Sequence, residues 1–164
     1  MAQRADNWID KIAKLIPGYS GYKAKEQRRD TDRALRQTIV SRLDDRRMIV
    51  DRVIAECSRQ MKFDALEPLE ALRRRLQLLS DAIRYAPAGY SGFFDTMQVK
   101  EADLELIYGH DLRVREEVEH LGSLVAGLDS NSPNLARDAD AAAQSAAKVE
   151  EMFRARDKVV TGID

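Results

Sequence analysis

The chain is poor in the residues that carry chemistry or cross-link small folds. It has one cysteine, Cys57, so it can form neither an internal disulfide nor a thiolate metal cluster. Only two histidines, His110 and His120, could act as a base or a metal ligand. No apolar run approaches the ~20 residues of a membrane-spanning helix, and the N-terminus has no signal-peptide pattern. We therefore expect a soluble cytoplasmic protein without a cofactor.

Aromatic residues are also scarce, and glycine and proline are few. Aromatics are 6% of the 164 residues, whereas charged residues are 34%, with 8 glycines and 4 prolines. This balance favours long helices with ion-paired surfaces over a β-sandwich or a barrel. The length suits one domain that spans residues 1–164.

The spacing of apolar residues predicts an all-α fold. Apolar side chains recur at helical intervals in five segments separated by glycine, proline or turn composition. We expect an elongated antiparallel bundle of four to five helices, with a body over residues 23–128. A short amphipathic helix over 6–16 precedes this body, and an alanine-rich helix over 134–160 follows it. Alanine in that last seam lets a neighbouring helix approach closely but buries little area per residue.

A Gly-Tyr-Ser-Gly motif followed by an aromatic residue occurs twice, at residues 18–22 and 89–93. It lacks the spacing of a serine-nucleophile elbow, and its flanks are helical rather than a strand followed by a helix. An up-down bundle would bring both loops toward one end, where they would form aromatic corners that seal the bundle. The alternative is an exposed patch that recognises a partner. Its candidate contacts are Tyr19, Tyr22, Arg28, Arg29, Tyr90, Phe93 and Phe94.

Two charged residues interrupt otherwise apolar stripes. Arg46 lies between Leu43 and Val50 in one helix, and Asp111 lies between Ile107 and Val114 in another. Their pattern predicts that Arg46 and Asp111 meet as a buried, charge-assisted pair that fixes the register of the helices. In the alternative, each stays hydrated at the edge of its seam.

The short N-terminal helix has an apolar face that includes Trp8 and Ile12 beside lysines. Packing of this face on the bundle is favoured. Docking on an anionic membrane surface is the alternative. Its contacts would be Trp8, Ile9, Ile12 and Ile16, with Lys11, Lys14, Lys23 and Lys25 facing the lipid.

No convergent catalytic set emerges from the sequence, so we expect no enzyme activity. Glu117 and His120 have the spacing of a carboxylate-bridged metal site, but the chain lacks the second Glu-x-x-His that such a site needs. The arginines of residues 28–47 alternate with aspartates, a pattern that disfavours nucleic acid as a partner.

The sequence therefore favours a helical adaptor, regulatory or scaffold protein that binds another protein or itself, with Trp8 and Ile12 among its candidate contacts. A peripheral membrane protein is the first alternative. A small-ligand or metal-binding bundle, with a pocket around Arg46, His110 and Asp111, is the second.

Overall fold

The computed structural model describes residues 10–14, 16–18, 25–86 and 101–161, with side chains left out for 25–29, 101–105 and 157–161. These residues are helical or lie in turns, and the predicted all-α bundle is confirmed. Four long helices run along the molecule: α2 (Lys25–Arg59), α3 (Leu66–Tyr85), α4 (Glu101–Ala126) and α5 (Leu135–Thr161). A single 3-10 turn, η1 (Phe63–Ala65), joins α2 to α3. Pro68 lies in the first turn of α3, where proline is tolerated because the missing N–H would have no partner within the helix.

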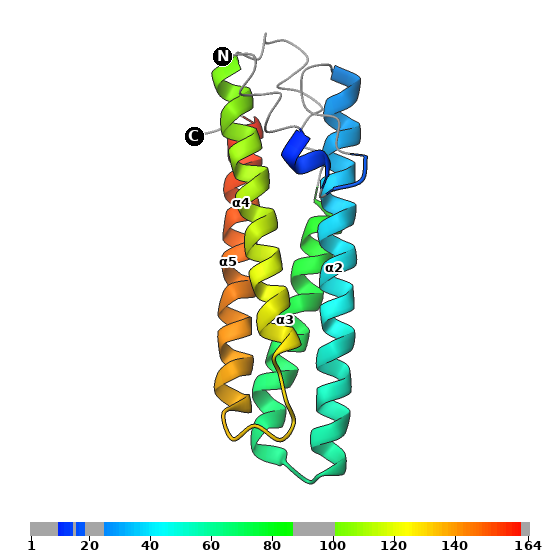
Figure 1. The fold of residues 1–164 in the computed structure, drawn as a ribbon, viewed down its shortest axis with the longest axis vertical. Coiled ribbons are helices and arrows are strands. Elements are labelled where there is room, and N and C mark those ends of the chain that lie inside the picture. The colour runs from blue at the N-terminus through cyan, green and yellow to red at the C-terminus, as the bar shows by residue number, and fades with distance from the viewer. Residues whose placement is uncertain (1–9, 15, 19–24, 87–100, 162–164) are drawn as a thin grey trace.

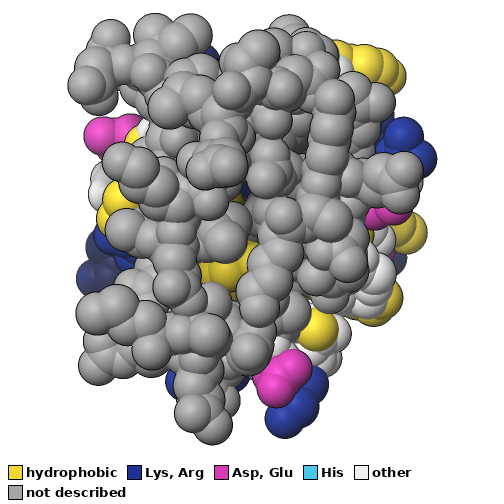
Figure 2. Space-filling model, turned by 90° about the horizontal axis from the view of Figure 1, so that it is seen from above, with side chains coloured by type: hydrophobic (Ala, Val, Ile, Leu, Met, Phe, Trp, Pro, Cys, Tyr) yellow, Lys and Arg dark blue, Asp and Glu magenta, His cyan; other side chains and the backbone are white. Residues whose placement is uncertain are grey.

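The four helices form a ring in which each helix has two neighbours. α2 packs against α3 and α4, and α5 packs against the same two helices. Figure 1 shows that α2 and α4 run in one direction while α3 and α5 run in the other. The hairpins α2/α3 and α4/α5 are antiparallel, whereas the α2/α4 and α3/α5 neighbours are parallel. Figure 2 looks along the bundle from the end where α2 begins and shows Lys and Arg side chains around its perimeter.

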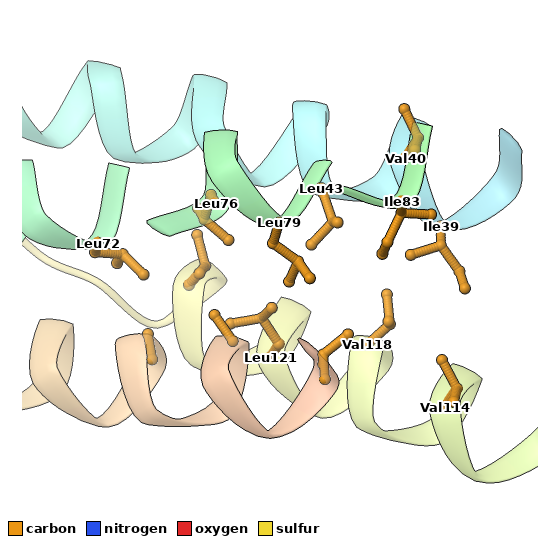
Figure 3. Packing of buried hydrophobic residues seen from close by; sticks show 14 of the residues in the cluster. Ile39, Val40, Leu43, Leu72, Leu76, Leu79, Ile83, Val114, Val118 and Leu121 are labelled. Carbon is orange, nitrogen blue, oxygen red and sulfur yellow. The ribbon is translucent and has the colours of Figure 1, made fainter. Parts of the chain in front are cut away.

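The apolar seams of the four helices meet in one continuous core. Leucine dominates the α3 seam, and valine and leucine dominate the α4 seam, where their side chains interdigitate with those of α2 (Figure 3). The α5 seam contributes small residues, Ala139, Ala142 and Ala146, before it widens to Val149 and Phe153. Burial of these side chains is the main source of bundle stability.

α2 ends in a Schellman motif with an unusual residue at its centre. The amide of Lys62 donates to the carbonyl of Cys57 (3.0 Å), and the amide of Met61 donates to the carbonyl of Ser58 (3.2 Å). This bond pair defines the motif, and its central residue adopts a left-handed conformation in which glycine is favoured. Met61 has φ +56°, so a bulky side chain occupies the glycine position. The adjacent Lys62 then donates from Nζ to the carbonyl of Ser130 (2.8 Å), which ties this turn to the α4–α5 connection.

The N-terminal segment packs on the bundle where the structure describes it. Residues 10–13 form one helical turn, and Ile12 and Ile16 are buried in the main core. Gly18 has φ +83°, and a Cβ there would lie 3.5 Å from the side chain of Ala34 on α2. A left-handed glycine that follows Pro17 explains why the turn stops before this point, as the Pro17-Gly18 sequence indicates.

Candidate functional site

A layer of buried charges crosses the bundle near the end where α2 begins. Arg156 on α5 donates from Nε to Oδ1 of Asp111 on α4 (2.6 Å) and from Nη1 to Oδ1 of Asp32 on α2 (2.8 Å). Both side chains of the Arg156–Asp111 pair are 0% exposed. α5 and α2 are not neighbours in the ring, so the Arg156 side chain spans the bundle diagonal. This long side chain joins three helices through one guanidinium group.

Arg36 completes this layer and links it to the fourth helix. Its Nε donates to Oδ2 of Asp32 (2.8 Å), and its Nη1 donates to the carbonyl of Ile83 on α3 (3.2 Å). The guanidinium groups of Arg36 and Arg156 lie 5.0 and 5.7 Å from the centre of the Phe153 ring. We call Asp32, Arg36, Asp111 and Arg156 the polar layer. Its two positive and two negative charges balance, which burial of ionised groups requires.

The polar layer corrects one prediction from the sequence. Asp111 is buried and charge-paired, as predicted, and is not hydrated at a seam edge. Its predicted partner is wrong, because Asp111 pairs with Arg156. Arg46 instead lies against Gly122, about three turns further along α4 than Asp111. The reason is the parallel direction of α2 and α4, which places Asp32, not Arg46, at the level of Asp111.

A second group of polar contacts joins α4 and α5 through Glu117. Glu117 accepts from Oγ of Ser145 (2.9 Å) at Oε1 and from Nζ of Lys148 (2.7 Å) at Oε2. Burial raises the pKa of Glu117, but the hydrogen bonds from Lys148 and Ser145 outweigh it and hold the pKa below its usual range. Both carboxylate oxygens are therefore engaged by α5. His120 lies on the rim of a cavity of about 310 Å³ in the groove between α4 and α5. Among the described residues, no cluster of three His, Cys, Asp or Glu could hold a metal ion.

A larger cavity of about 720 Å³ lies over α2 beside the end of α3. Its polar lining contains both signs of charge in equal number: Arg33, Arg36 and Arg84 against Asp32, Asp44 and Asp45. Arg84 donates to Asp44 (2.7 Å), and Arg36 donates to Asp32, so these groups already neutralise one another. The lining therefore gives no preference for an anionic or a cationic ligand.

The outer face of α3 exposes an apolar row that the bundle does not cover. Ala71, Leu78 and Tyr85 are seven residues apart, and Ala82 fills the position four residues after Leu78. Leu78 is 68% exposed and Tyr85 is 75% exposed, and both alanines are exposed as well. We call these four residues the α3 row. Seven-residue spacing of apolar side chains on one helix face is the pattern by which a second helix packs.

The charges around the α3 row are largely engaged within the bundle. Arg73 pairs with Glu70 (2.7 Å), and Arg75 pairs with Glu150 of α5 (3.4 Å). Arg74, which lies beside the row, has no ion pair among the described residues. An apolar row with one unpaired cation beside it is suited to a partner helix that carries a carboxylate beside its own apolar seam.

The sequence missed the α3 row and placed its interaction candidates elsewhere. Ile12 was a candidate contact, and this prediction is wrong, because its side chain is wholly buried in the core. Ile16 is buried too, which supports packing of the N-terminal helix on the bundle. Arg28 and Arg29 lie in α2, but their side chains are outside the described residues. The remaining candidates also lie outside them: Trp8, Tyr19, Tyr22, Tyr90, Phe93 and Phe94.

Comparison of the chain with protein-family models, with curated proteins and with solved structures found no match. No helix among the described residues combines the length and the apolar content that crossing a bilayer requires.

Proposed function

We propose that the protein is a non-catalytic helical adaptor or scaffold that binds another protein, or a second copy of itself, through the α3 row. The observation that carries the proposal is the exposure of Leu78 and Tyr85, one heptad apart, on a helix whose opposite face is the core. Single exposed apolar residues are common on protein surfaces and need no explanation. A row at heptad spacing is the geometry of a helix–helix contact.

Leu78 and Tyr85 supply most of the apolar area that a partner could cover on this surface. Burial of a leucine or an aromatic side chain contributes about 1.5–3 kcal/mol each relative to its exposed state. Leu78 and Tyr85 together would therefore contribute roughly 3–6 kcal/mol before the costs of association. Tyrosine is enriched among the residues that dominate interface energies. The small side chains of Ala71 and Ala82 would let the partner helix approach closely.

The composition of the row also restricts the partner. A membrane surface would be contacted by a broad apolar face flanked by lysines, whereas the α3 row is narrow and is flanked by arginines, two of which, Arg73 and Arg75, are ion-paired. A helix with apolar residues every seven positions and a carboxylate near Arg74 fits this surface. The alanine-rich α5 does not provide such a seam, since its apolar face is turned into the core.

The test replaces one row residue by a charge and compares it with a matched control. Leu78→Asp places a carboxylate in the row, and Met48→Asp does the same on the outer face of α2. Met48 is 66% exposed, almost as much as Leu78, but does not belong to the row. We expect Leu78→Asp to abolish association and Met48→Asp to leave it unchanged. Association is measured by light scattering of the purified chain and by quantitative cross-linking in extracts of its own cell.

Tyr85→Asp provides a second, independent perturbation of the same row. It should weaken the same cross-links that Leu78→Asp removes. The proposal fails if the unmodified chain and all three variants have the same mass in solution and the same cross-linked partners. Circular dichroism shows whether each variant is folded, and a loss of association counts only for a variant that is folded.

A further inference from the structure

Three guanidinium groups gather in the groove between the parallel helices α2 and α4. Arg42 and Arg46 come from α2, and Arg115 comes from α4; we call them the arginine cluster. Arg42 makes an ion pair with Glu119 of α4. Arg115 lies one turn before Glu119 on the same helix, and Arg46 lies against Gly122, one turn after it. The three arginines therefore lie alongside about two turns of α4, and Glu119 is ion-paired with only one of them, Arg42.

Gly122 is the reason that Arg46 can enter this groove. A Cβ at residue 122 would lie 2.8 Å from Nε, 2.9 Å from Nη2 and 3.2 Å from Cζ of Arg46. The guanidinium group thus lies directly over the α4 backbone, in the space that any other side chain would occupy. Glycine in a helix interior destabilises the helix by about 1 kcal/mol relative to alanine. What the glycine provides is room for a cation between two helices.

The positive charge of the arginine cluster is not balanced by its carboxylates. Glu119 neutralises Arg42, and Asp45 on the outer side of α2 adds one further negative charge nearby. Neither Arg46 nor Arg115 makes an ion pair with another described residue. The Nε atoms of both are buried and have no hydrogen-bond partner in the part of the chain that the structure describes. Burial, together with repulsion from Arg115 and Arg46, lowers the pKa of Arg42.

We propose that the arginine cluster binds a small oxyanion of the phosphate class in the α2/α4 groove. A phosphate group offers several acceptor oxygens and up to two negative charges, and planar guanidinium groups bind such groups through paired hydrogen bonds. Arg46 and Arg115 supply the donors, from facing helices, and Arg42 reinforces the positive field while it holds Glu119. The site is distinct from the α3 row, because α3 lies diagonally across the bundle from α4.

Isothermal titration with inorganic phosphate, in a phosphate-free buffer at constant ionic strength, tests the assignment. Arg115→Gln and Arg46→Gln should each weaken phosphate binding about tenfold or more, the value of one lost hydrogen bond to a charged group. Arg52→Gln is the matched control, because Arg52 is an exposed arginine of α2 that belongs neither to the arginine cluster nor to the α3 row. The control should bind phosphate as the unmodified chain does. A parallel titration with pyrophosphate separates a single phosphate group from a diphosphate as the preferred ligand.

Gly122→Ala supplies a variant that keeps all three positive charges. Its Cβ displaces the Arg46 guanidinium, so phosphate binding should weaken although the net charge is unchanged. Alanine is the better helix former, so this variant is also expected to fold. Equal phosphate affinity in the unmodified chain, Arg115→Gln and Gly122→Ala would overturn the proposal. The absence of binding to either phosphate or pyrophosphate would overturn it as well.

Discussion

Replacement of Arg156 by methionine tests the polar layer most directly. Arg156 is 0% exposed and is shared by two carboxylates, Asp111 and Asp32. Methionine fills much of the same volume but cannot donate, so Asp111 loses a hydrogen bond and an ion-pair partner inside the core. Removal of one member of a buried ion pair costs about 3–5 kcal/mol, because the remaining charge is left uncompensated. A domain of this size has a free energy of unfolding of about 5–15 kcal/mol, so Arg156→Met should remove a large part of it.

The control for this prediction lies two residues away on the same helix. Arg154 is 76% exposed and pairs with Glu150 (2.6 Å) at the surface. Arg154→Met should cost less than about 1 kcal/mol, the usual range for an exposed pair. Both free energies of unfolding are measured by urea denaturation followed by circular dichroism. If Arg156→Met lowers the free energy by less than about 1 kcal/mol, the polar layer does not stabilise the fold as the geometry implies.

A double variant separates the pairing from the loss of side-chain volume. Asp111→Leu alone should also be strongly destabilising, because Arg156 then lacks one of its two carboxylates. Asp111→Leu combined with Arg156→Met removes one charge of each sign and leaves Asp32 paired with Arg36. The double variant should therefore be more stable than the sum of the two single effects predicts, with a coupling of roughly 0.5–3 kcal/mol. Simple additivity would show that Asp111 and Arg156 do not act as a pair.

Three further predictions concern the ends and grooves of the bundle. Met61→Gly should stabilise the protein by about 1 kcal/mol, since glycine adopts the left-handed Schellman position without strain, and a higher Tm would show it. Burial raises the pKa of the Cys57 thiol, so it should resist thiol reagents in the native state and react only at the rate of unfolding. The lowered pKa of Glu117 stabilises the fold above the unfolded value of 4.5, and this contribution is lost as pH falls through the folded pKa. Glu117→Gln should therefore flatten the stability profile below about pH 4.5 in urea melts at graded pH.

The helices could be predicted from the sequence because their seams are regular. The absence of glycine and proline between Lys23 and Lys62 predicts one long helix, and α2 spans Lys25–Arg59. The Pro133 turn predicts a new helix, and α5 begins at Leu135. Local composition determines these boundaries, so a single sequence is sufficient to find them.

The partners of the buried charges could not be assigned from the same pattern. Along α5, the buried residues are spaced alternately four and three positions apart, and one further step past Phe153 reaches Arg156. Along α2, the apolar stripe extended back from Ile39 reaches Arg36 and Asp32. The pattern therefore contained a signal that these charges are buried. The expected up-down bundle already implied the helix directions, but the pattern contained no signal for which helices are neighbours. α2 and α4 run parallel in an up-down meander as well as in the observed ring, so neither arrangement brings Arg46 to the level of Asp111, and Arg156 pairs with it instead.

The polar layer gives the bundle a register that its apolar seams do not. Leucine, valine and alanine seams tolerate a shift of one helical turn, about 5.4 Å, with modest loss of burial. The same shift of α5 would move Arg156 away from both Asp111 and Asp32, and it would leave Arg156 and Asp111 unmatched while Asp32 keeps its pair with Arg36. Such a shift would also change the level at which Arg75 of α3 meets Glu150 of α5. The buried charges thus hold α3 and α5 at one relative height, and the α3 row is presented at a fixed level on the outside of the bundle.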